Sequence, residues 1–562
     1  MKQPILTLAL VVMALASMGQ AIIHNNAAQI TSGTGGTESY WVVSGGAITL
    51  KSESATNLTT FGNLKIVDGA SLALTSASCL TVNGALENAT GINGLTVPSD
   101  NTYTASLMIK GSTAASGTVE RYMTPFKWHV VAAPASETLS GFLVRNIIIP
   151  NITGGSNDGS LLGMMDYNTV GNAWNGYFTT ATGGSFSAGK GYLVRTFPDD
   201  IEFLNFKGTL KAGQTDVTVT SGWNCIGNPY TTAIHISKGD DAFLTVNGTT
   251  KLEKTDPIID PNHYGVYYWN PADTKYDVVN EASADATYAQ SGQGFFVKAK
   301  TGLVTSGEGK NDFVTFKPAM QVHNTSMVFK AASLPYPSIK LMATNEEAKF
   351  STDIKFIDGT SNGLDRGYDA GILKAGAPFS VYTKLVEDNG VEFQLQCLPN
   401  TGFSKIIIPV GVDSKTGGEI VFSVETAQLD PTCKVILEDR LSNTFTDLST
   451  NTYKAAVAAN STGTGRFYLH TGDIVSGLED QVLADGKLTA YARGNKEIRV
   501  LGEVGNDAVA TLVNGLGQVV LTKKLGAGTL NIIGLPNMSS GLYLLNIDNN
   551  GTPQTIKVMV RK

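Results

Sequence analysis

The stretch SGLYLLNIDNNGTPQTIKVMVRK (Ser540 to Lys562) ends the chain with two alternating runs on either side of a turn. Apolar residues occupy every second position from Tyr543 to Ile547 and again from Ile556 to Val560. A period of two on both sides of Asn549-Asn550-Gly551 predicts a β-hairpin. Chain ends are usually poorly ordered. A patterned hairpin here therefore indicates an end that packs into a sheet or is recognised as one.

The rest of the chain shares this composition. Of the 562 residues, 42% are hydrophobic, only 16% are charged, and 61 are glycines. Ser, Thr, Asn and Gly must therefore cover much of the surface, which favours strands and turns over helices. The length predicts about three or four domains. We expect an all-β protein.

The charge pattern bears on the kind of partner, and the first residues bear on location. The formal net charge of −7 is spread along the chain without a basic run, which argues against nucleic acid as a partner. Residues 1–21 combine one cation, an apolar stretch and small residues near their end, which predicts a secretory signal peptide cleaved after Ala21. No later segment has the apolar length of a spanning helix, so we expect no transmembrane span in the mature chain.

Residues 22–118 repeat short alternations punctuated by Gly and Asn, as in GNLKIVDGASLALTSASCLTVNG. Units this short cannot bury an apolar face alone. We therefore expect stacked coils in a short β-solenoid-like region, and a flat hairpin sheet is the alternative.

Residues 119–310 are rich in aromatic residues within strand-like runs, such as VERYMTPFKWHVVAAP and YGVYYWNPADTKYD. Runs bounded by Gly, Asn or Pro predict an antiparallel β-sandwich-like module, and the aromatic residues predict a large core. In the alternative, the aromatic residues form a platform that stacks against sugar rings. The candidates for such glycan stacking are Trp174, Tyr264 and Trp269.

The remaining segments predict further antiparallel modules. Residues 311–474 hold about ten short strand-like runs at regular spacing, which is typical of an antiparallel β-sandwich. Residues 475–486 form a polar linker. Residues 487–562 supply about seven strands, which predict a small Ig-like β-sandwich.

Three motifs in this last segment resemble the type A C-terminal sorting domain of the type IX secretion system of certain Gram-negative bacteria. They are ATLVNGLGQVV (Ala510 to Val520), NIIGLPNMSSGLYLLNI (Asn531 to Ile547) and TIKVMVRK (Thr555 to Lys562). The sequence departs from the family at LTAYARGNKEIRVLG, where many members have a stretch containing Asn-Pro. The residues assigned to the sorting signal are Gly515, Gly517, Gly541, Tyr543, Lys557 and Lys562.

The resemblance implies an export address. The signal peptide delivers such chains to the periplasm, and the sorting domain is then presented to a translocon in the outer membrane. In that family the domain is usually cleaved off, and the mature protein is released or attached to the surface. The implied partners are the translocon and its sorting peptidase, and the implied destination is the cell surface or the extracellular space.

The rest of the chain resembles multidomain β-rich surface proteins of the same bacteria. The motifs that carry this resemblance, in order, are VERYM, WHVVAAP, GWNCIGNPY, YYWN, GQGFFVKA, GLDRGYDA, LEDR and GRFYLH. The resemblance implies architecture more than activity.

Motifs for catalysis are not found in the sequence. The six histidines show no zinc-binding spacing, and neither a serine-hydrolase elbow nor a phosphate loop occurs. Carboxylates available for glycosidase chemistry are Glu120, Asp365, Asp369, Glu438 and Asp439. Arginines next to several of them favour structural pairs, and Asp260, Asp365 and Asp369 lack a calcium-loop pattern. We expect no catalytic residue, no cofactor and no metal.

The four cysteines, Cys79, Cys225, Cys397 and Cys433, lie far apart without a C-x-x-C spacing. Buried free thiols are the expected state. A bridge between Cys397 and Cys433 is the alternative, which export would permit.

These features together predict a non-enzymatic surface or secreted protein, either an adhesin or an envelope or matrix component, with a surface glycan or matrix ligand as partner. The alternative is a carbohydrate-binding or carbohydrate-active secreted protein. An exposed coplanar row of aromatic residues favours the alternative, whereas burial between sheets favours the first prediction.

Overall fold

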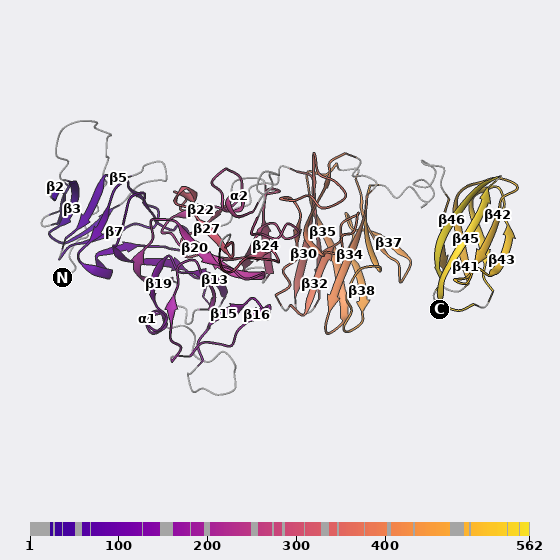
Figure 1. The fold of residues 1–562 in the computed structure, drawn as a ribbon, viewed down its shortest axis with the longest axis horizontal. Helices are drawn as coiled ribbons and strands as arrows, with labels where there is room; N and C mark the ends of the chain where they lie inside the picture. The colour runs from indigo at the N-terminus through magenta and orange to yellow at the C-terminus, as the bar shows by residue number, and fades with distance from the viewer. Residues whose placement is uncertain are drawn as a thin grey trace. The chain divides into compact units, whose positions relative to one another are not determined.

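Strands make up most of the computed structural model, which confirms the all-β prediction. The chain divides into two compact units, residues 1–472 and 473–562, and each is described by itself (Figure 1). The predicted signal peptide (1–21), the predicted linker (475–486) and Lys562 lie outside the described residues. The structure describes residues 23–25, 28–35, 38–50, 59–67, 69–125, 127–146, 161–179, 181–195, 203–248, 257–271, 275–283, 287–307, 310–326, 336–345, 348–375, 377–401, 406–430, 433–472, 488–493, 496–536, 538–549 and 551–560.

Three coils of parallel-paired strands stack in the N-terminal region, drawn in indigo and violet in Figure 1. The first coil is β3 (Glu38–Ser44), β4 (Ala47–Leu50) and β5 (Thr59–Phe61); the second is β6 (Asn63–Ile66), β7 (Ser71–Leu74) and β8 (Cys79–Val82); the third is β9 (Leu86–Asn88), β10 (Leu95–Val97) and β11 (Ser106–Ile109). Each strand pairs in parallel with its counterpart in the next coil. This is the pairing of stacked coils and not of a flat hairpin sheet.

Alternation of side chains explains why the coils stack. Leu64 and Ile66 of β6 are buried, and Leu72 of β7 is 1% exposed. In register, Leu64 lies opposite Leu86 and Leu72 lies opposite Leu95, so each leucine stacks on the leucine of the next coil. Burying one such side chain contributes about 1.5–3 kcal/mol. Stacking thus buries the apolar surface that one coil would leave exposed.

The solenoid-like region continues directly into the next segment. Its edge strand β12 (Ser116–Tyr122) pairs in parallel with β10 and antiparallel with β19 (Phe203–Leu210). β14 (Ala135–Thr138) then pairs with β19, and β17 (Ser185–Phe186) pairs with β14. One hydrophobic core runs from Val43 to Ala212. The described core therefore crosses the position at 118/119 where the sequence predicts a domain boundary. In a different sheet, that of β3, β6 and β9, β1 (Ile23–Asn25) and β2 (Ala28–Gly35) extend the β3 edge by antiparallel pairing.

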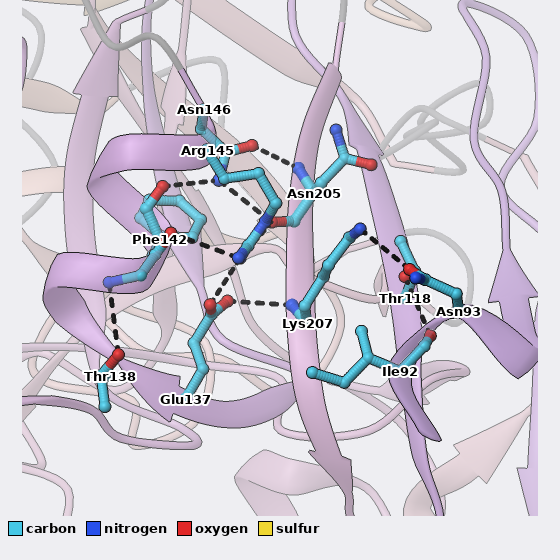
Figure 2. A network of polar contacts seen from close by, with 11 residues as sticks. Ile92, Asn93, Thr118, Glu137, Thr138, Phe142, Arg145, Asn146, Asn205 and Lys207 are labelled. Carbon is cyan, nitrogen blue, oxygen red and sulfur yellow. Dashed lines mark hydrogen bonds and ion pairs between the residues drawn. The ribbon is translucent and has the colours of Figure 1, made fainter. Parts of the chain in front are cut away.

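Helix α1 (Leu139–Arg145) is fastened to β19 by polar contacts (Figure 2). Oγ1 of the N-cap Thr138 accepts a hydrogen bond from the first helical turn at 3.2 Å. At the other end Arg145 donates to the carboxylate of Glu137, and its Nε and Nη2 donate to the carbonyl of Asn205 at 3.2 and 3.0 Å. The second carboxylate oxygen of Glu137 accepts the backbone N–H of Lys207 at 2.9 Å. The network holds the helix, β14 and β19 as one body.

Four small sheets with a fully buried aromatic core form the following segment. They consist of β13 (Trp128–Ala132), β18 (Gly191–Arg195), β15 (Met164–Asn168) and β16 (Ala173–Trp174); β21 (Gly222–Gly227), β26 (Gly294–Ala299), β23 (Val266–Asn270) and β24 (Lys275–Val279); β20 (Thr215–Thr218) and β27 (Phe313–Phe316); and β25 (Tyr288–Ala289), β22 (Ala233–His235) and β28 (Gln321–Val322). Tyr230, Tyr267 and Phe295 are 0% exposed. Most of the aromatic residues thus serve as core, as the sequence predicts. The first unit also contains the short helices α2 (Phe243–Asn247), η1 (Gly91–Gly94) and η2 (Pro318–Met320).

Residues 338–471 correct the prediction of a two-sheet sandwich, because their strands form one continuous and nearly closed sheet. In order across the sheet the strands are β37 (Thr444–Asp447), β36 (Val435–Asp439), β39 (Phe467–Thr471), β34 (Ile407–Ser414), β32 (Phe379–Thr383), β33 (Phe393–Pro399), β30 (Lys349–Ile357), β29 (Ser338–Thr344), β35 (Gly418–Ala427) and β38 (Tyr453–Val457), with β31 (Ala370–Gly371) paired to β33. We call this part the barrel.

The difference comes from pairs between strands that are distant in sequence. β29 pairs with both β30 and β35, and β30 pairs in parallel with β33. The spacing of strands along a chain does not specify such partners. A sheet that curls round its own core also leaves few edges unpaired.

The second unit holds two small antiparallel sheets, drawn in yellow in Figure 1. One contains β40 (Thr489–Arg493), β41 (Glu497–Val504) and β44 (Gly528–Gly534), and the other contains β43 (Val519–Lys524), β42 (Val509–Val513), β45 (Gly541–Asn549) and β46 (Thr552–Val560). Ile498 and Val500 of the first sheet share a hydrophobic core with Leu512 and Leu545 of the second. The sheets therefore pack as two layers, and the Ig-like topology stays a prediction.

The terminal hairpin is formed as predicted. β45 and β46 pair antiparallel from Gly541 opposite Val560 to Asn549 opposite Thr552. Gly551 in the connecting turn has a φ of 87°, a left-handed conformation that glycine adopts at little cost. The predicted inward face is buried at Tyr543, Leu545, Ile547, Val558 and Val560.

Candidate functional site

A cavity of about 380 Å³ is a candidate binding site in the first unit. Its walls carry Trp128, Trp174 and Trp269, and its charged lining residues are Lys275 and Lys374. Small-molecule sites usually measure about 300–1,000 Å³ and are lined mostly by apolar and aromatic side chains. The cavity matches both features. We call it the tryptophan cavity.

The walls of the tryptophan cavity come from two parts of the chain. Trp128 begins β13, Trp174 ends β16 and Trp269 lies in β23, so the tryptophans belong to the two four-stranded sheets of the aromatic-rich segment. Phe350 of β30 and Lys374, which precedes β32, come from the barrel. The cavity therefore lies where these two parts meet.

Hydrogen bonds fix this junction. The Tyr267 hydroxyl donates to the carbonyl of Gly371 at 2.6 Å, and Lys355 Nζ donates to the carbonyl of Ala282 at 2.8 Å. Gln394 Nε2 donates to the carbonyl of Tyr276. Each bond joins the aromatic-rich segment to the barrel, so the walls of the cavity are held in place without a ligand.

Neighbouring rings hold the tryptophans. Trp174 makes edge contacts with Tyr167, at a ring-centroid distance of 5.2 Å, and with Phe296, at 5.5 Å. Trp269 lies edge-on to Tyr276 at 5.1 Å. Edge-to-face contacts of this kind add about 0.5–1.5 kcal/mol beyond area burial. The rings are therefore fixed walls of the cavity, and because each tryptophan is partly buried they do not form an exposed row.

The two lysines of the cavity already have carboxylate partners. Lys275 Nζ lies 2.9 Å from Asp277 and 2.7 Å from Ser351 Oγ. Lys374 Nζ binds both Glu392 and Asp413. Burial alone lowers the pKa of Lys374, but these two carboxylates outweigh it and raise the pKa above its ordinary value. Neither lysine is an uncompensated cation.

Of the three aromatic residues predicted to stack on sugars, the structure brings two together. Trp174 and Trp269 both line the tryptophan cavity. Tyr264 corrects the prediction: it is 1% exposed, and its hydroxyl donates to the carbonyl of Leu244 at 3.2 Å. Helix α2, about 20 residues earlier in the chain, covers the ring, and the strand pattern around Tyr264 does not reveal this burial.

Sequence reasoning missed Trp128 and the two lysines. Trp128 is 46 residues before Trp174 and lies in WHVVAAP, one of the motifs quoted above. An aromatic residue at the start of a strand-like run is a weak signal. Only the pairing of β13 with β18, and of β18 with β15, places it in the sheet of Trp174.

Glu438 and Asp439 sit in ion pairs on the barrel. Asp439 is 0% exposed and accepts hydrogen bonds from Arg466 Nε at 3.0 Å and Nη2 at 2.7 Å. Burial alone raises the pKa of Asp439, but hydrogen bonds from Arg466 and Tyr453 hold it below its usual value. Hydrogen bonds from His470 and Arg440 likewise outweigh burial and lower the pKa of Glu438. Both carboxylates are thus ionised partners of arginine.

Asp365 and Asp369 lie in the loop between β30 and β31, and a hydrogen bond joins the two residues. Asp369 is 0% exposed and accepts the backbone N–H of Asp365 at 2.6 Å and that of Cys397 at 2.7 Å. Burial raises the pKa of Asp369 to about 7 despite these bonds. Burial also raises the pKa of Glu120, which lies opposite Asn205 in the pairing of β12 with β19.

Asp260 is held by the side chains of His263 and Lys298. Burial alone raises its pKa, but His263 and Lys298, 3.5 and 3.7 Å away, with the N–H of Asn262, lower it to about 2. Its oxygens are therefore committed to protein partners.

All four cysteines are free thiols, so Cys397 and Cys433 do not form the bridge that the sequence left open. Cys397 is 0% exposed, and its thiol donates to the carbonyl of Tyr368 at 3.3 Å. Cys79 and Cys225 are also buried as predicted, whereas Cys433 is partly exposed, which corrects the prediction for that residue.

The residues assigned to the sorting signal lie in turns and in the terminal hairpin. Gly517 has a φ of 81° and donates its N–H to the carbonyl of Asn514, which closes the turn that also contains Gly515. Tyr543 packs in the core, and its hydroxyl donates to the carbonyl of Ser539 at 2.9 Å. Gly541 starts β45.

Of the two lysines assigned to the sorting signal, the structure describes Lys557. Lys557 is exposed on β46 opposite Leu544. Lys562 is outside the described residues. Among the helices of the described residues, none is long and apolar enough to cross a membrane.

Two families match the chain. The family described as "Secretion system C-terminal sorting domain" matches residues 494–561. This confirms the sorting domain of the type IX secretion system, so the protein is exported to the cell surface or the extracellular space. The family described as "Domain of unknown function (DUF8693)" matches residues 20–470. None of the curated proteins matches the sequence.

Two solved structures share limited similarity with the chain. A polysaccharide lyase has 11% identity and a TM-score of 0.14, and the match covers 40% of this chain and 39% of the lyase. A biofilm-associated protein, represented by its BSP domain, has 8% identity and a TM-score of 0.15, with 79% of this chain and 92% of that chain covered. TM-scores this low carry no argument about fold or activity.

The match to residues 20–470 spans most of the chain and all of the solenoid-like region, the aromatic-rich segment and the barrel. The chain therefore belongs to the family described as "Domain of unknown function (DUF8693)" and ends in a secretion system C-terminal sorting domain.

Proposed function

We propose that the protein is a non-enzymatic component of the cell surface or its surroundings that acts in adhesion or in the envelope or matrix, and that it binds its ligand in the tryptophan cavity. The observation that carries the proposal is the cavity itself, in which Trp128, Trp174 and Trp269 wall a space of about 380 Å³. Apolar walls with a few polar groups are typical of binding sites. The sorting domain brings this site to the outside of the cell.

The state of the carboxylates supports a role in binding and not in catalysis. Glycosidases need two carboxyl groups on either side of the scissile bond. Among the described residues that line the tryptophan cavity there is no Asp or Glu. Glu438 and Asp439, the candidates with the closest arginines, are engaged in ion pairs on the barrel.

A carbohydrate-binding protein is the second candidate, and the tryptophans of the cavity favour it. Aromatic rings offer large apolar faces, and two of the three predicted stacking residues, Trp174 and Trp269, are in the cavity. In this case adhesion would be adhesion to a glycan.

Whole cells test the proposed function. Cells that lack the gene are complemented with the wild-type chain, with a Trp174→Ala/Trp269→Ala double variant, or with Tyr103→Ala, which removes a 42% exposed aromatic residue that does not line the cavity. Attachment to surfaces coated with polysaccharides or matrix proteins is counted at equal amounts of exported protein. We expect loss of attachment without the gene and with the double variant only. Unchanged attachment of cells without the gene would contradict the proposal.

A further inference from the structure

We propose that the tryptophan cavity binds an uncharged pyranose, such as the end residue of a neutral surface glycan. This inference rests on the proposed binding function and names the class of ligand. Three features of the cavity carry it: its aromatic walls, its compensated charges and one ammonium hydrogen that no carboxylate uses.

The aromatic walls suit the apolar faces of a sugar ring. Trp128, Trp174 and Trp269 are each partly buried, so each side chain is packed on one part and accessible on another. Edge contacts with Tyr167, Phe296 and Tyr276 fix two of these rings. Because the rings are already ordered, stacking of a ligand on them costs little side-chain conformational entropy. A pyranose presents C–H groups on its faces and hydroxyls around its edge, which matches apolar walls with polar groups between them.

The charges favour a neutral ligand over an anion. The ammonium group of Lys275 is 2.9 Å from Asp277, and that of Lys374 binds both Glu392 and Asp413. A uronic acid or phosphate would have to compete with these carboxylates for the same cations. An anion therefore gains little in this cavity, since removing a cation from its partner leaves a carboxylate unpaired.

The charges also disfavour a cation. An aromatic cage on its own would suit a quaternary ammonium group. Here Lys275 and Lys374 are lining residues, whereas Asp277, Glu392 and Asp413 are not. A cation in the cavity would therefore meet two ammonium groups and find no lining carboxylate to pair with.

Lys374 supplies a suitable donor for a hydroxyl. An ammonium group has three N–H donors. Lys374 uses two of them for Glu392 and Asp413, and its Nζ lies 4.6 Å from the ring centroid of Tyr382. The third can donate to the oxygen of a sugar hydroxyl, which both donates and accepts.

The experiment uses the chain from residue 22 to its end. Calorimetric titration measures the binding of methyl glycosides of glucose, galactose, mannose and N-acetylglucosamine, and of glucuronate and tetramethylammonium as charged probes. We expect at least one neutral glycoside to bind and both charged probes to fail. Binding of a charged probe alone, or of no probe, would overturn the inference.

Variants locate the binding. Trp174→Ala is expected to weaken the binding of the neutral glycoside about tenfold, as the loss of a stacked ring predicts. Trp174→Tyr keeps an aromatic face and is expected to retain most of the affinity. Lys374→Met keeps the apolar stem and is expected to lose affinity; because it leaves Glu392 and Asp413 without their cation, its folding is checked by circular dichroism before the titration. Tyr103→Ala is the control and is expected to bind like the wild type. Equal affinity in all variants would overturn the assignment to this cavity.

The outcomes separate this inference from the proposed function. If cells attach through the protein but no neutral glycoside competes with attachment, the ligand class is wrong and the proposed function stands. If cells without the gene attach normally, the proposed function fails as well. Competition by a soluble polysaccharide or by a glycoprotein shows which of the two carries the sugar.

Discussion

At the scale of single residues, the ion pair of Asp439 and Arg466 holds a fully buried carboxylate. Asp439 is 0% exposed and accepts two hydrogen bonds from Arg466 and one from Tyr453 at 2.8 Å. A buried carboxylate without its partner costs far more than the pair contributes. The pair therefore fixes the position of β36 beside β39.

Arg466→Ala is expected to lower the free energy of unfolding by about 3–5 kcal/mol, because it leaves Asp439 charged and buried. Urea unfolding followed by circular dichroism measures the loss. The control is Lys454→Ala, which breaks an exposed pair with Glu419 and should cost less than about 1 kcal/mol. Equal losses in the two variants would show that Asp439 does not depend on Arg466.

His323 predicts a dependence of stability on pH. Its ring nitrogens lie 2.8 Å from the hydroxyls of Thr81 in β8 and Ser106 in β11. Burial, together with the charge of Lys110, lowers the pKa of His323 from 6.5 to about 4. The fold thus favours the neutral ring. Its contribution to stability is fully present above pH 6.5 and is lost as the pH falls through 4.

We therefore expect acid to destabilise the wild type more than His323→Gln. The free energy of unfolding is measured at pH 7.5 and pH 4.5, and the fall between them should be smaller in the variant by about 1–2 kcal/mol. The same fall in both proteins would mean that His323 does not titrate with folding.

At the scale of elements, three glycines at one corner of successive coils govern stacking. Gly62 precedes β6, Gly84 precedes β9, and Gly111 follows β11. The N–H of Gly84 donates to the carbonyl of Gly62 at 2.8 Å. A Cβ at Gly111 would lie 2.3 Å from the carbonyl oxygen of Gly84, whereas a Cβ at Gly62 would meet nothing within 4 Å. The coils approach too closely at Gly111 for any side chain.

Gly111→Ala is expected to destabilise the solenoid-like region by about 1–3 kcal/mol, as overpacking does. Gly62→Ala is the matched control and is expected to be neutral or slightly stabilising. The urea midpoints of the two variants are compared with that of the wild type. A midpoint for Gly111→Ala equal to that of the control would refute the close approach of the coils.

The contrast between the coils and the barrel shows what the sequence can predict. Alternation in β6 and β7, with turns between, predicts both the strands and their stacking, because each strand pairs with the next of its kind along the chain. In the barrel, alternation also predicts the strands. Their partners, such as β35 for β29, are about eighty residues away, and a local pattern holds no information on them. The sandwich was therefore the wrong arrangement of mostly correct strands.

The candidate site could be predicted only in part, for the same reason. Aromatic content pointed to Trp174 and Trp269, which do line the tryptophan cavity. It pointed equally to Tyr264, which α2 buries. The contribution of Lys374 depends on the barrel meeting the aromatic-rich segment, which no local pattern encodes.

At the scale of the whole molecule, the division into two compact units separates the sorting domain from the unit that holds the proposed binding site. Removal of residues 480–562 should leave the first unit folded, because its cores contain no residue of the second unit. The truncated protein is expected to accumulate in the periplasm, since it lacks the sorting domain. Cell fractionation with immunodetection measures its location. Its normal appearance outside the cell would refute the role of this domain in export.

The most direct test of the central claim asks whether the exported chain binds without reacting. The chain from residue 22 to its end is incubated with a panel of polysaccharides and matrix proteins, and both retained ligand and released product are recorded. We expect retention of a ligand, competition by a neutral glycoside and no released product, because no carboxylate of the described residues lines the cavity. Release of shortened product by the wild type would contradict this expectation.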